Sequence, residues 1–155
     1  MAHTNLRVCS LNVNGMRDHS KRAQLFTWFK AKKIDIVFLQ ETHCKSYSDS
    51  KLWEKEWGGK CFWSFGGSRS RGTCIMFRDG LPFKKHMFHY DAVGRLIVLD
   101  INLYGCSYHL LMCTCLTIMR NAYSGLMNYI GGLSGIKFLY WVATLIALRT
   151  QALTK

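Results

Sequence analysis

The feature that most constrains the fold is the run Ile34–Leu39, which is apolar except for one aspartate. A run of this kind is typical of a strand that is buried on both faces. A helix starting at Ser20 and running to about Lys33 is predicted before it, and a strand is predicted over Leu6–Val13. Strand, helix and strand in this order predict a right-handed crossover unit, and therefore an α/β fold.

The pattern after this unit changes to short strands and tight turns. A short helix is predicted over Ser50–Trp57, followed by strands that together predict an antiparallel meander: Phe62–Phe65, Thr73–Phe77, Pro82–Tyr90, Arg95–Ile101 and Ser107–Leu111. A chain of 155 residues with 49% hydrophobic residues corresponds to about one domain with its own core. We expect the aromatic residues of this region to be core residues rather than a base-stacking platform: Trp53, Trp57, Phe62 and Trp63.

The charge is distributed unevenly along the chain. The net charge is +12, yet residues 101–155 contain no Asp or Glu and only four basic residues, Arg120, Lys137, Arg149 and Lys155. Chemistry that needs carboxylates must therefore come from the first hundred residues. The same hundred residues hold seventeen of the twenty-one basic residues, which favours attraction to phosphate.

The cysteines and the N-terminus bear on the compartment. The seven cysteines are irregularly spaced with no C-x-x-C pair, which predicts reduced thiols in an intracellular protein of the nucleus or cytoplasm. His43-Cys44 and Cys113-x-Cys115 could each be half of a zinc site, but neither has a second half. The polar N-terminus does not resemble a signal peptide, so secretion is not expected.

Polar side chains follow the first two predicted strands. Asn12 and Asn14 end the first, and Glu41 comes directly after the second. Because open α/β sheets place their sites at the carboxyl ends of neighbouring strands, these oxygen donors could meet around a hard cation such as Mg²⁺. The alternatives are an ordinary Asn-Gly turn and a surface or capping glutamate. Arg69 and Arg71 lie in a glycine-rich loop, Gly66–Gly72, which could meet a phosphate or be a plain hairpin loop.

Two paired motifs carry a resemblance to a known family. LNVNGMR followed by IDIVFLQETH resembles the start of the endonuclease/exonuclease/phosphatase superfamily. EWGG, FWSFG, SRGTCIMF and GRLIVLDI resemble more narrowly the N-terminal endonuclease domain of the reverse-transcriptase polyproteins of LINE-like (non-LTR) retrotransposons, which is related to exonuclease III and the apurinic/apyrimidinic endonucleases. The resemblance covers about residues 5–111.

The resemblance implies the N-terminal part of a four-layered α/β sandwich and hydrolysis of a DNA phosphodiester with Mg²⁺ or Mn²⁺, without a small-molecule cofactor. By the same resemblance, Glu41 is a metal ligand and Asn12 helps to place metal and phosphate. Asn14 is a weaker candidate ligand, because many relatives carry Asp there. Arg69 and Arg71 are candidate contacts to nucleic acid.

Later motifs that complete the family's site do not occur here. They are an N-x-Y-x-P-N segment, a G-D-x-N segment whose Asp acts on the attacking water, and a C-terminal Ser-Asp-His whose His acts on the phosphate. The general base and the catalytic His are therefore absent, and the domain is truncated. His109 has no acidic partner nearby in sequence, and we interpret it as a strand histidine.

The tail suggests a cause for this loss. If the codons of residues 111–119 are read two bases later, codon degeneracy permits N-V-Y-V-P-N-D, and the same shift of residues 141–147 permits G-G-D-F-N-C. Both are segments that the family requires. We therefore expect residues 5–111 to be a partial endonuclease domain and residues 112–155 to be an out-of-frame tail without family motifs, a hypothesis that the coding DNA would test.

Three functions remain open at this stage. The first is a nuclease fragment with weak or no activity, and the second is a non-enzymatic basic module that binds nucleic acid. The third is a tail-anchored membrane protein, because the tail from Leu126 to Leu148 is long and apolar enough to span a bilayer, although Asn128 and Lys137 interrupt it. The sequence favours the first, and it gives no oligomeric state.

Overall fold

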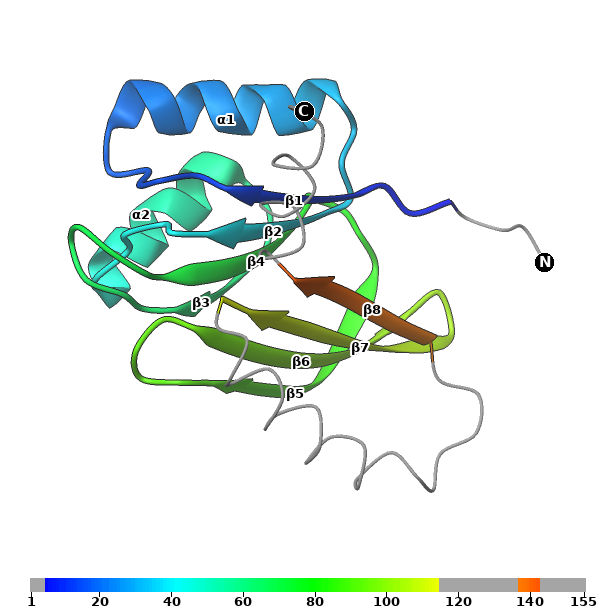
Figure 1. The fold of residues 1–155 in the computed structure, drawn as a ribbon. Helices are drawn as coiled ribbons and strands as arrows, with labels where there is room; N and C mark the ends of the chain where they lie inside the picture. Colours follow the sequence, from blue (N-terminus) through cyan, green and yellow to red (C-terminus); the bar gives the residue numbers. More distant parts are fainter. Residues whose placement is uncertain (1–4, 115–136, 143–155) are drawn as a thin grey trace, which may run out of the picture.

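The computed structural model describes residues 5–114 and, for the backbone alone, residues 137–142. The helices of this part of the chain lie on one face of a first sheet, and a second sheet lies on its other face (Figure 1). The helices are α1 (His19–Ala31) and α2 (Tyr47–Trp57). The two mixed sheets match the expected N-terminal part of an endonuclease/exonuclease/phosphatase sandwich.

The first sheet has the strand order β1-β2-β4-β3. Its strands are β1 (Val8–Asn12), β2 (Ile36–Gln40), β3 (Cys61–Ser64) and β4 (Thr73–Phe77). β1 and β2 are parallel neighbours joined by α1, which confirms the predicted crossover unit. β4 pairs antiparallel with both β2 and β3, so the first two strands expected in the meander belong instead to this sheet.

The second sheet has the order β5-β6-β7-β8. Its strands are β5 (Phe83–Tyr90), β6 (Leu96–Leu103), β7 (Cys106–Cys113) and β8 (Lys137–Val142). β5, β6 and β7 form the predicted meander, and β8 lies parallel to β7. β8 falls within the apolar stretch considered above as a membrane span, and the rest of that stretch lies outside the described residues. No helix among the described residues is long and apolar enough to cross a membrane.

Strict alternation along the central strands gives the molecule two cores. Val37 and Leu39 of β2 point toward the helices, where they join a cluster with Phe29 and Trp57. Ile36 and Phe38 point toward the second sheet and join a cluster with β6 and β7. Both faces of β2 are therefore buried, which explains the continuous apolar run in the sequence.

Both helix starts differ from the prediction. α1 is capped by Asp18, whose Oδ1 accepts from the Lys21 N–H at 2.7 Å, so Ser20 already lies inside the helix. α2 is capped by Ser46, whose Oγ accepts from the Asp49 N–H at 3.2 Å, so the helix starts before Ser50. Both N-caps have short polar side chains. Several residues of this kind occur near each helix start, so the sequence does not single out the capping residue.

Candidate functional site

The carboxyl ends of β1 and β2 lie side by side and carry the predicted residues. Asn12 ends β1 and lies opposite Gln40, the last residue of β2. The chain past both strands stays paired, since the Val13 N–H donates to the Gln40 carbonyl at 2.9 Å and the Gly15 N–H to the Glu41 carbonyl at 2.6 Å. The structure therefore brings the segment containing Asn12 and Asn14 next to Glu41, as predicted.

A third segment completes this edge. The loop between β3 and β4 lies against the chain after β2: the Thr42 N–H donates to the Gly72 carbonyl at 3.0 Å and the His43 N–H to the Arg71 carbonyl at 2.9 Å. The Glu41 Oε2 accepts from the Arg71 backbone N–H at 2.7 Å. Arg71 thus joins the site through its backbone. The structure gives Arg69 an exposed position in the same loop and no contact with Glu41.

His43 is a site residue that the sequence interpretation missed. Its Nε2 lies 3.5 Å from the Glu41 Oε2, and its side chain is mostly buried. In the sequence it was considered only as half of a zinc site with Cys44. Its position two residues beyond Glu41 at the end of a buried strand was the available signal, because the two side chains project from the same turn. Together Asn12, Asn14, Glu41, His43 and Arg71 form what we call the Glu41 site.

The backbone of the Glu41 site is unusual. Asn14, Glu41, His43 and Arg71 all have positive φ, between 45° and 63°. Each such residue costs on the order of 1–3 kcal/mol, and residues of this kind tend to gather at functional sites. Here the backbone hydrogen bonds among the three segments hold the strained conformations in place.

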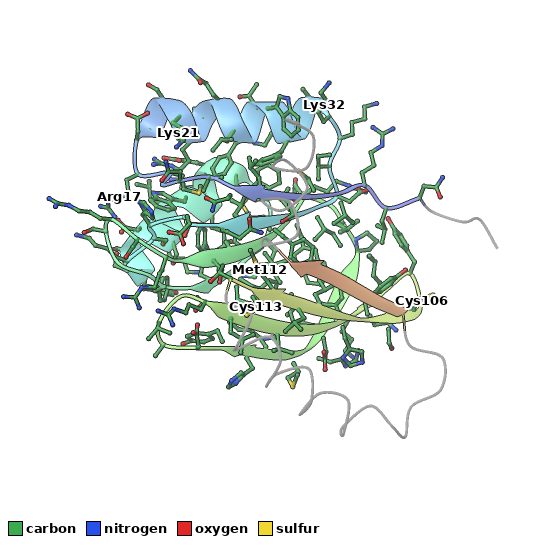
Figure 2. All side chains as sticks on the ribbon, in the orientation of Figure 1. Arg17, Lys21, Lys32, Cys106, Met112 and Cys113 are labelled. Atoms are coloured by element: carbon green, nitrogen blue, oxygen red, sulfur yellow. The ribbon has the colours of Figure 1, made fainter. Side chains whose placement is uncertain are left out.

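The loop after β1 is held in place by a lysine of α1. The Lys21 Nζ donates to the Val13 carbonyl at 2.6 Å and to the Asn14 carbonyl at 3.1 Å. The Asn12 Oδ1 accepts from the Asn14 N–H at 3.0 Å, which is the hydrogen bond of an Asx turn. Figure 2 shows Arg17 and Lys21 at this end of the molecule, where α1 begins, and Lys32 at the opposite end. Lys21 therefore fixes the loop after β1 through its side chain.

A buried ion pair joins the helices beside this loop. The Arg22 guanidinium meets the Glu56 carboxylate through Nε–Oε2 at 2.5 Å and Nη2–Oε1 at 2.8 Å, and it also donates to the Met16 and Arg17 carbonyls at 3.0 Å. The hydrogen bond from Arg22 lowers the pKa of Glu56 below its ordinary value and outweighs the opposing effect of burial.

The donors of the Glu41 site fit a hard cation that keeps most of its water. The site offers one carboxylate with the amide oxygens of Asn12 and Asn14, and each of these oxygens has more than one lone pair. No group of three or more His, Cys, Asp or Glu suited to a metal occurs among the described residues. A closed, all-protein cage is therefore not built here, whereas Mg²⁺ typically takes one or two carboxylates and completes its shell with water and phosphate.

His109 lies on the second sheet, and the Cys44 thiol, directly after His43, is buried in the core under the helices. His109 is on β7, and its Nδ1 lies 2.5 Å from the Oδ1 of Asp100 on β6. His109 is a strand residue, as interpreted from the sequence, and the antiparallel register places it opposite Asp100, an acidic residue nine positions away in the sequence. Burial raises the pKa of the Cys44 thiol to about 12, so this thiol stays protonated, as expected of a core cysteine.

The family model described as Endonuclease/Exonuclease/phosphatase family matches residues 9–109. The chain belongs to this family. The match spans both strand ends of the Glu41 site and most of the second sheet, which agrees with the family resemblance noted in the sequence.

A transposon protein and several solved structures are similar to this chain. A Xenopus laevis transposon TX1 protein of 149 kDa is 29% identical over 108 residues, which are 68% of this chain and 8% of that protein. The endonuclease domain of TRAS1, a telomere-specific non-LTR retrotransposon, has a TM-score of 0.56 at 12% identity, over 86% of this chain and 57% of that one.

A TDP2 structure from D. rerio, complexed with a single-strand DNA product, has a TM-score of 0.58 at 18% identity and covers 86% of this chain and 58% of that chain. At these identities the structural similarities show the fold alone. The chain spans less than two thirds of each of these relatives.

Proposed function

We propose that this chain is an endonuclease-like fragment that binds a divalent cation and a DNA phosphate at the Glu41 site but hydrolyses the phosphodiester weakly or not at all. The observation on which this rests is the convergence of Asn12, Glu41 and the Arg71 loop from three separate segments. Membership of the family and the similarity to a retrotransposon endonuclease support the nuclease-like part of the proposal.

In this proposal Glu41 is the main ligand of Mg²⁺ or Mn²⁺. When bound, the metal would neutralise charge on the phosphate oxygens. Asn12 would orient the phosphate or a metal-bound water through its amide, and Asn14 would be a weaker ligand. His43 and the Arg71 N–H, both directed at the Glu41 Oε2, act as positioning groups for the carboxylate.

Several observations support DNA as the partner. The chain carries a net charge of +12, and Arg69 and Arg71 lie in a loop at the Glu41 site. A relative with the same fold was solved with a single-strand DNA product. We also propose that the protein is intracellular, in the nucleus or cytoplasm, because its cysteine pattern is that of reduced thiols.

The proposal of weak activity rests on family motifs that are missing from the sequence. The motifs that would supply the general base and the catalytic His do not occur in this sequence. Since general acid–base catalysis contributes about 10²–10⁴-fold to a rate, the residues of the Glu41 site can place a phosphate without efficiently activating water. The hypothesis of an out-of-frame tail over residues 112–155 would explain this loss.

Metal binding tests the site itself. We expect Mn²⁺ to bind the full chain in a calorimetric titration, and Glu41→Gln to weaken binding by at least about tenfold, because the neutral amide removes the only charged donor proposed for the ion. Asp79→Asn is the matched control, since Asp79 is an exposed carboxylate in the Asp79-Gly80 turn outside the Glu41 site. Equal Mn²⁺ affinity of the wild type and Glu41→Gln would contradict the proposed site.

Plasmid nicking tests the proposed lack of activity. We expect purified chain with Mg²⁺ to nick supercoiled plasmid at no more than the rate of Glu41→Gln. Robust Mg²⁺-dependent nicking that Glu41→Gln abolishes would show that the missing motifs are not needed. Steeply salt-dependent DNA binding without cleavage and without any effect of Glu41→Gln would favour the second candidate, a basic nucleic-acid-binding module.

A further inference from the structure

A cavity lies at the edge of the first sheet. It has a volume of about 200 Å³ and lies between α2, the edge strand β3 and the edge strand β5. We call it the aromatic groove and define it by six of its lining residues: Tyr47, Lys51, Lys60, Phe65, Phe88 and Tyr90.

One end of the aromatic groove lies next to the Glu41 site. Tyr47 starts α2, and Phe65 precedes Gly66, whose N–H donates to the Cys44 carbonyl at 2.9 Å directly after His43. Tyr90 ends β5, and the next residue, Asp91, accepts from the Ser64 hydroxyl at 2.7 Å. The Phe65 end of the groove is therefore joined to the segment after His43 by one backbone hydrogen bond.

The walls of the aromatic groove present ring faces to solvent. Tyr47 is 68% exposed and Tyr90 is 45% exposed, which is high for residues of this size. Tyr90 is supported from behind by Phe88, with ring centroids 5.2 Å apart and planes 24° from parallel. A rigid, partly exposed ring is the kind of surface on which a nucleobase stacks. The cavity is smaller than the about 300–1,000 Å³ of typical small-molecule sites, so it suits a single ring.

The rim of the aromatic groove is cationic. The Lys51 and Lys60 ammonium groups lie 3.2 Å and 3.3 Å from the same carboxylate, Glu54, which cannot neutralise both. Lys51 also lies over the Tyr47 ring, 5.2 Å from its centroid. An anion with a flat ring attached is complementary to this combination of charge and aromatic surface.

An open sheet edge can also bind an added peptide strand, but the backbone of β3 is poorly suited to this. β3 has only four residues, and its first N–H, that of Cys61, already donates to the Glu54 Oε1 at 3.2 Å. A peptide that pairs with an edge needs a row of unpaired backbone groups. Here the edge is short and partly capped by a side chain.

We infer that the aromatic groove binds an unpaired base of a single-stranded nucleic acid, with the adjoining phosphate at the Lys51–Lys60 rim and the strand continuing to the Glu41 site. This inference rests on the proposed function, because it places the same strand at both positions. It makes single-stranded or locally opened nucleic acid the substrate class, since a base inside a duplex cannot reach the groove.

Binding of a fluorescent thymidine oligonucleotide to the full chain tests the inference, with anisotropy as the readout and a duplex for comparison. We expect Tyr47→Ala and Tyr90→Ala each to weaken single-strand binding by about tenfold, as the loss of one stacked base would. Duplex binding should change by less than about twofold. Tyr104→Ala is the matched control, because Tyr104 is 46% exposed but lies in the β6–β7 turn. Because Tyr90 packs on Phe88, Tyr47→Ala, at an exposed position in the first turn of α2, carries the test if Tyr90→Ala unfolds.

Photo-crosslinking locates the bound strand. An oligonucleotide with a single 5-iodouracil should crosslink to peptides containing Tyr47, Phe65 or Tyr90, and Glu41→Gln should leave these crosslinks in place. Wild-type affinity in the Tyr47→Ala variant, crosslinks confined to the Arg69–Arg71 loop, or binding of an extended peptide but no oligonucleotide would overturn the inference. The proposed function fails separately if Glu41→Gln leaves Mn²⁺ affinity unchanged.

Discussion

At the scale of single residues, Gly15 lies beside the Glu41 site at a position with no room for a side chain. Its φ is +80°, and a Cβ there would lie 2.7 Å from the His43 Nδ1. Gly80 has a similar φ of +71° but open space around it. Comparing alanine substitutions at Gly15 and Gly80 therefore separates the free-energy cost of a positive φ from the cost of the steric clash between the new Cβ and His43.

We expect Gly15→Ala to lower the free energy of unfolding by more than Gly80→Ala, for which the backbone cost alone is about 1 kcal/mol. We also expect Gly15→Ala, and not Gly80→Ala, to weaken Mn²⁺ binding, because a displaced His43 can no longer hold the Glu41 carboxylate. Urea denaturation and calorimetry measure the two effects. Equal behaviour of the two variants would show that His43 moves aside without consequence.

Single residues also show where sequence reasoning succeeded. The segments that carry Asn12, Asn14 and Glu41 could be predicted to lie side by side, because they follow the two parallel strands of a right-handed crossover unit. The contact of His43 with Glu41 could not be predicted, because it depends on the left-handed backbone of both residues, which their residue types do not indicate. The Asp100–His109 contact likewise depends on the register of two strands.

At the scale of elements, the Arg22–Glu56 pair fixes α1 to α2 next to the loop of the Glu41 site. Arg22 is almost fully buried, whereas Glu56 keeps some contact with water. We expect Arg22→Ala to cost about 3 kcal/mol of unfolding free energy in urea denaturation, because it removes both guanidinium hydrogen bonds to Glu56 and the donor of the Met16 and Arg17 carbonyls. Arg17→Ala is the control, since its pair with Asp49 is exposed and is worth less than about 1 kcal/mol.

The same pair gives a pH dependence with a definite sign. Because Arg22 lowers the pKa of Glu56 in the folded chain, the pair stabilises the fold above the ordinary glutamate pKa of 4.5. That contribution is lost as the pH falls below 4.5 and through the lowered pKa. The stability difference between wild type and Glu56→Gln should therefore shrink between pH 5 and lower pH, and a constant difference would contradict it.

The packing of the elements could be predicted only in part from the sequence. The apolar run of β2 predicted a strand with two buried faces but not which element covers each face. The strands β3 and β4 are predicted in the meander because they are short and precede β5 to β7 directly, although unlike β5 they carry no charged residue. They join the first sheet because the alternating pattern of β4 buries Cys74 and Met76 under the helices and Ile75 and Phe77 under the second sheet.

At the scale of the whole molecule, the two cores share the strands of the first sheet and should unfold together. Phe29 belongs to the core under the helices and Phe38 to the core between the sheets, and both are fully buried. We expect Phe29→Ala and Phe38→Ala each to cost about 3–5 kcal/mol and to shift one common transition. Far-UV and near-UV circular dichroism, recorded in the same urea series, should coincide for both variants. Two separate transitions in the Phe38→Ala variant would show that the cores are independent.

The order of the strands along the chain has a consequence for biosynthesis. The first sheet and both helices come from residues 8–77, so this half can close while the ribosome is still translating the second sheet. Until β6 and β7 arrive, the face carrying Ile36, Phe38, Ile75 and Phe77 has nothing to cover it. At about 5–20 residues per second, that interval lasts a few seconds, and it is the stage at which a nascent chain of this fold is most open to capture by a chaperone or by another copy.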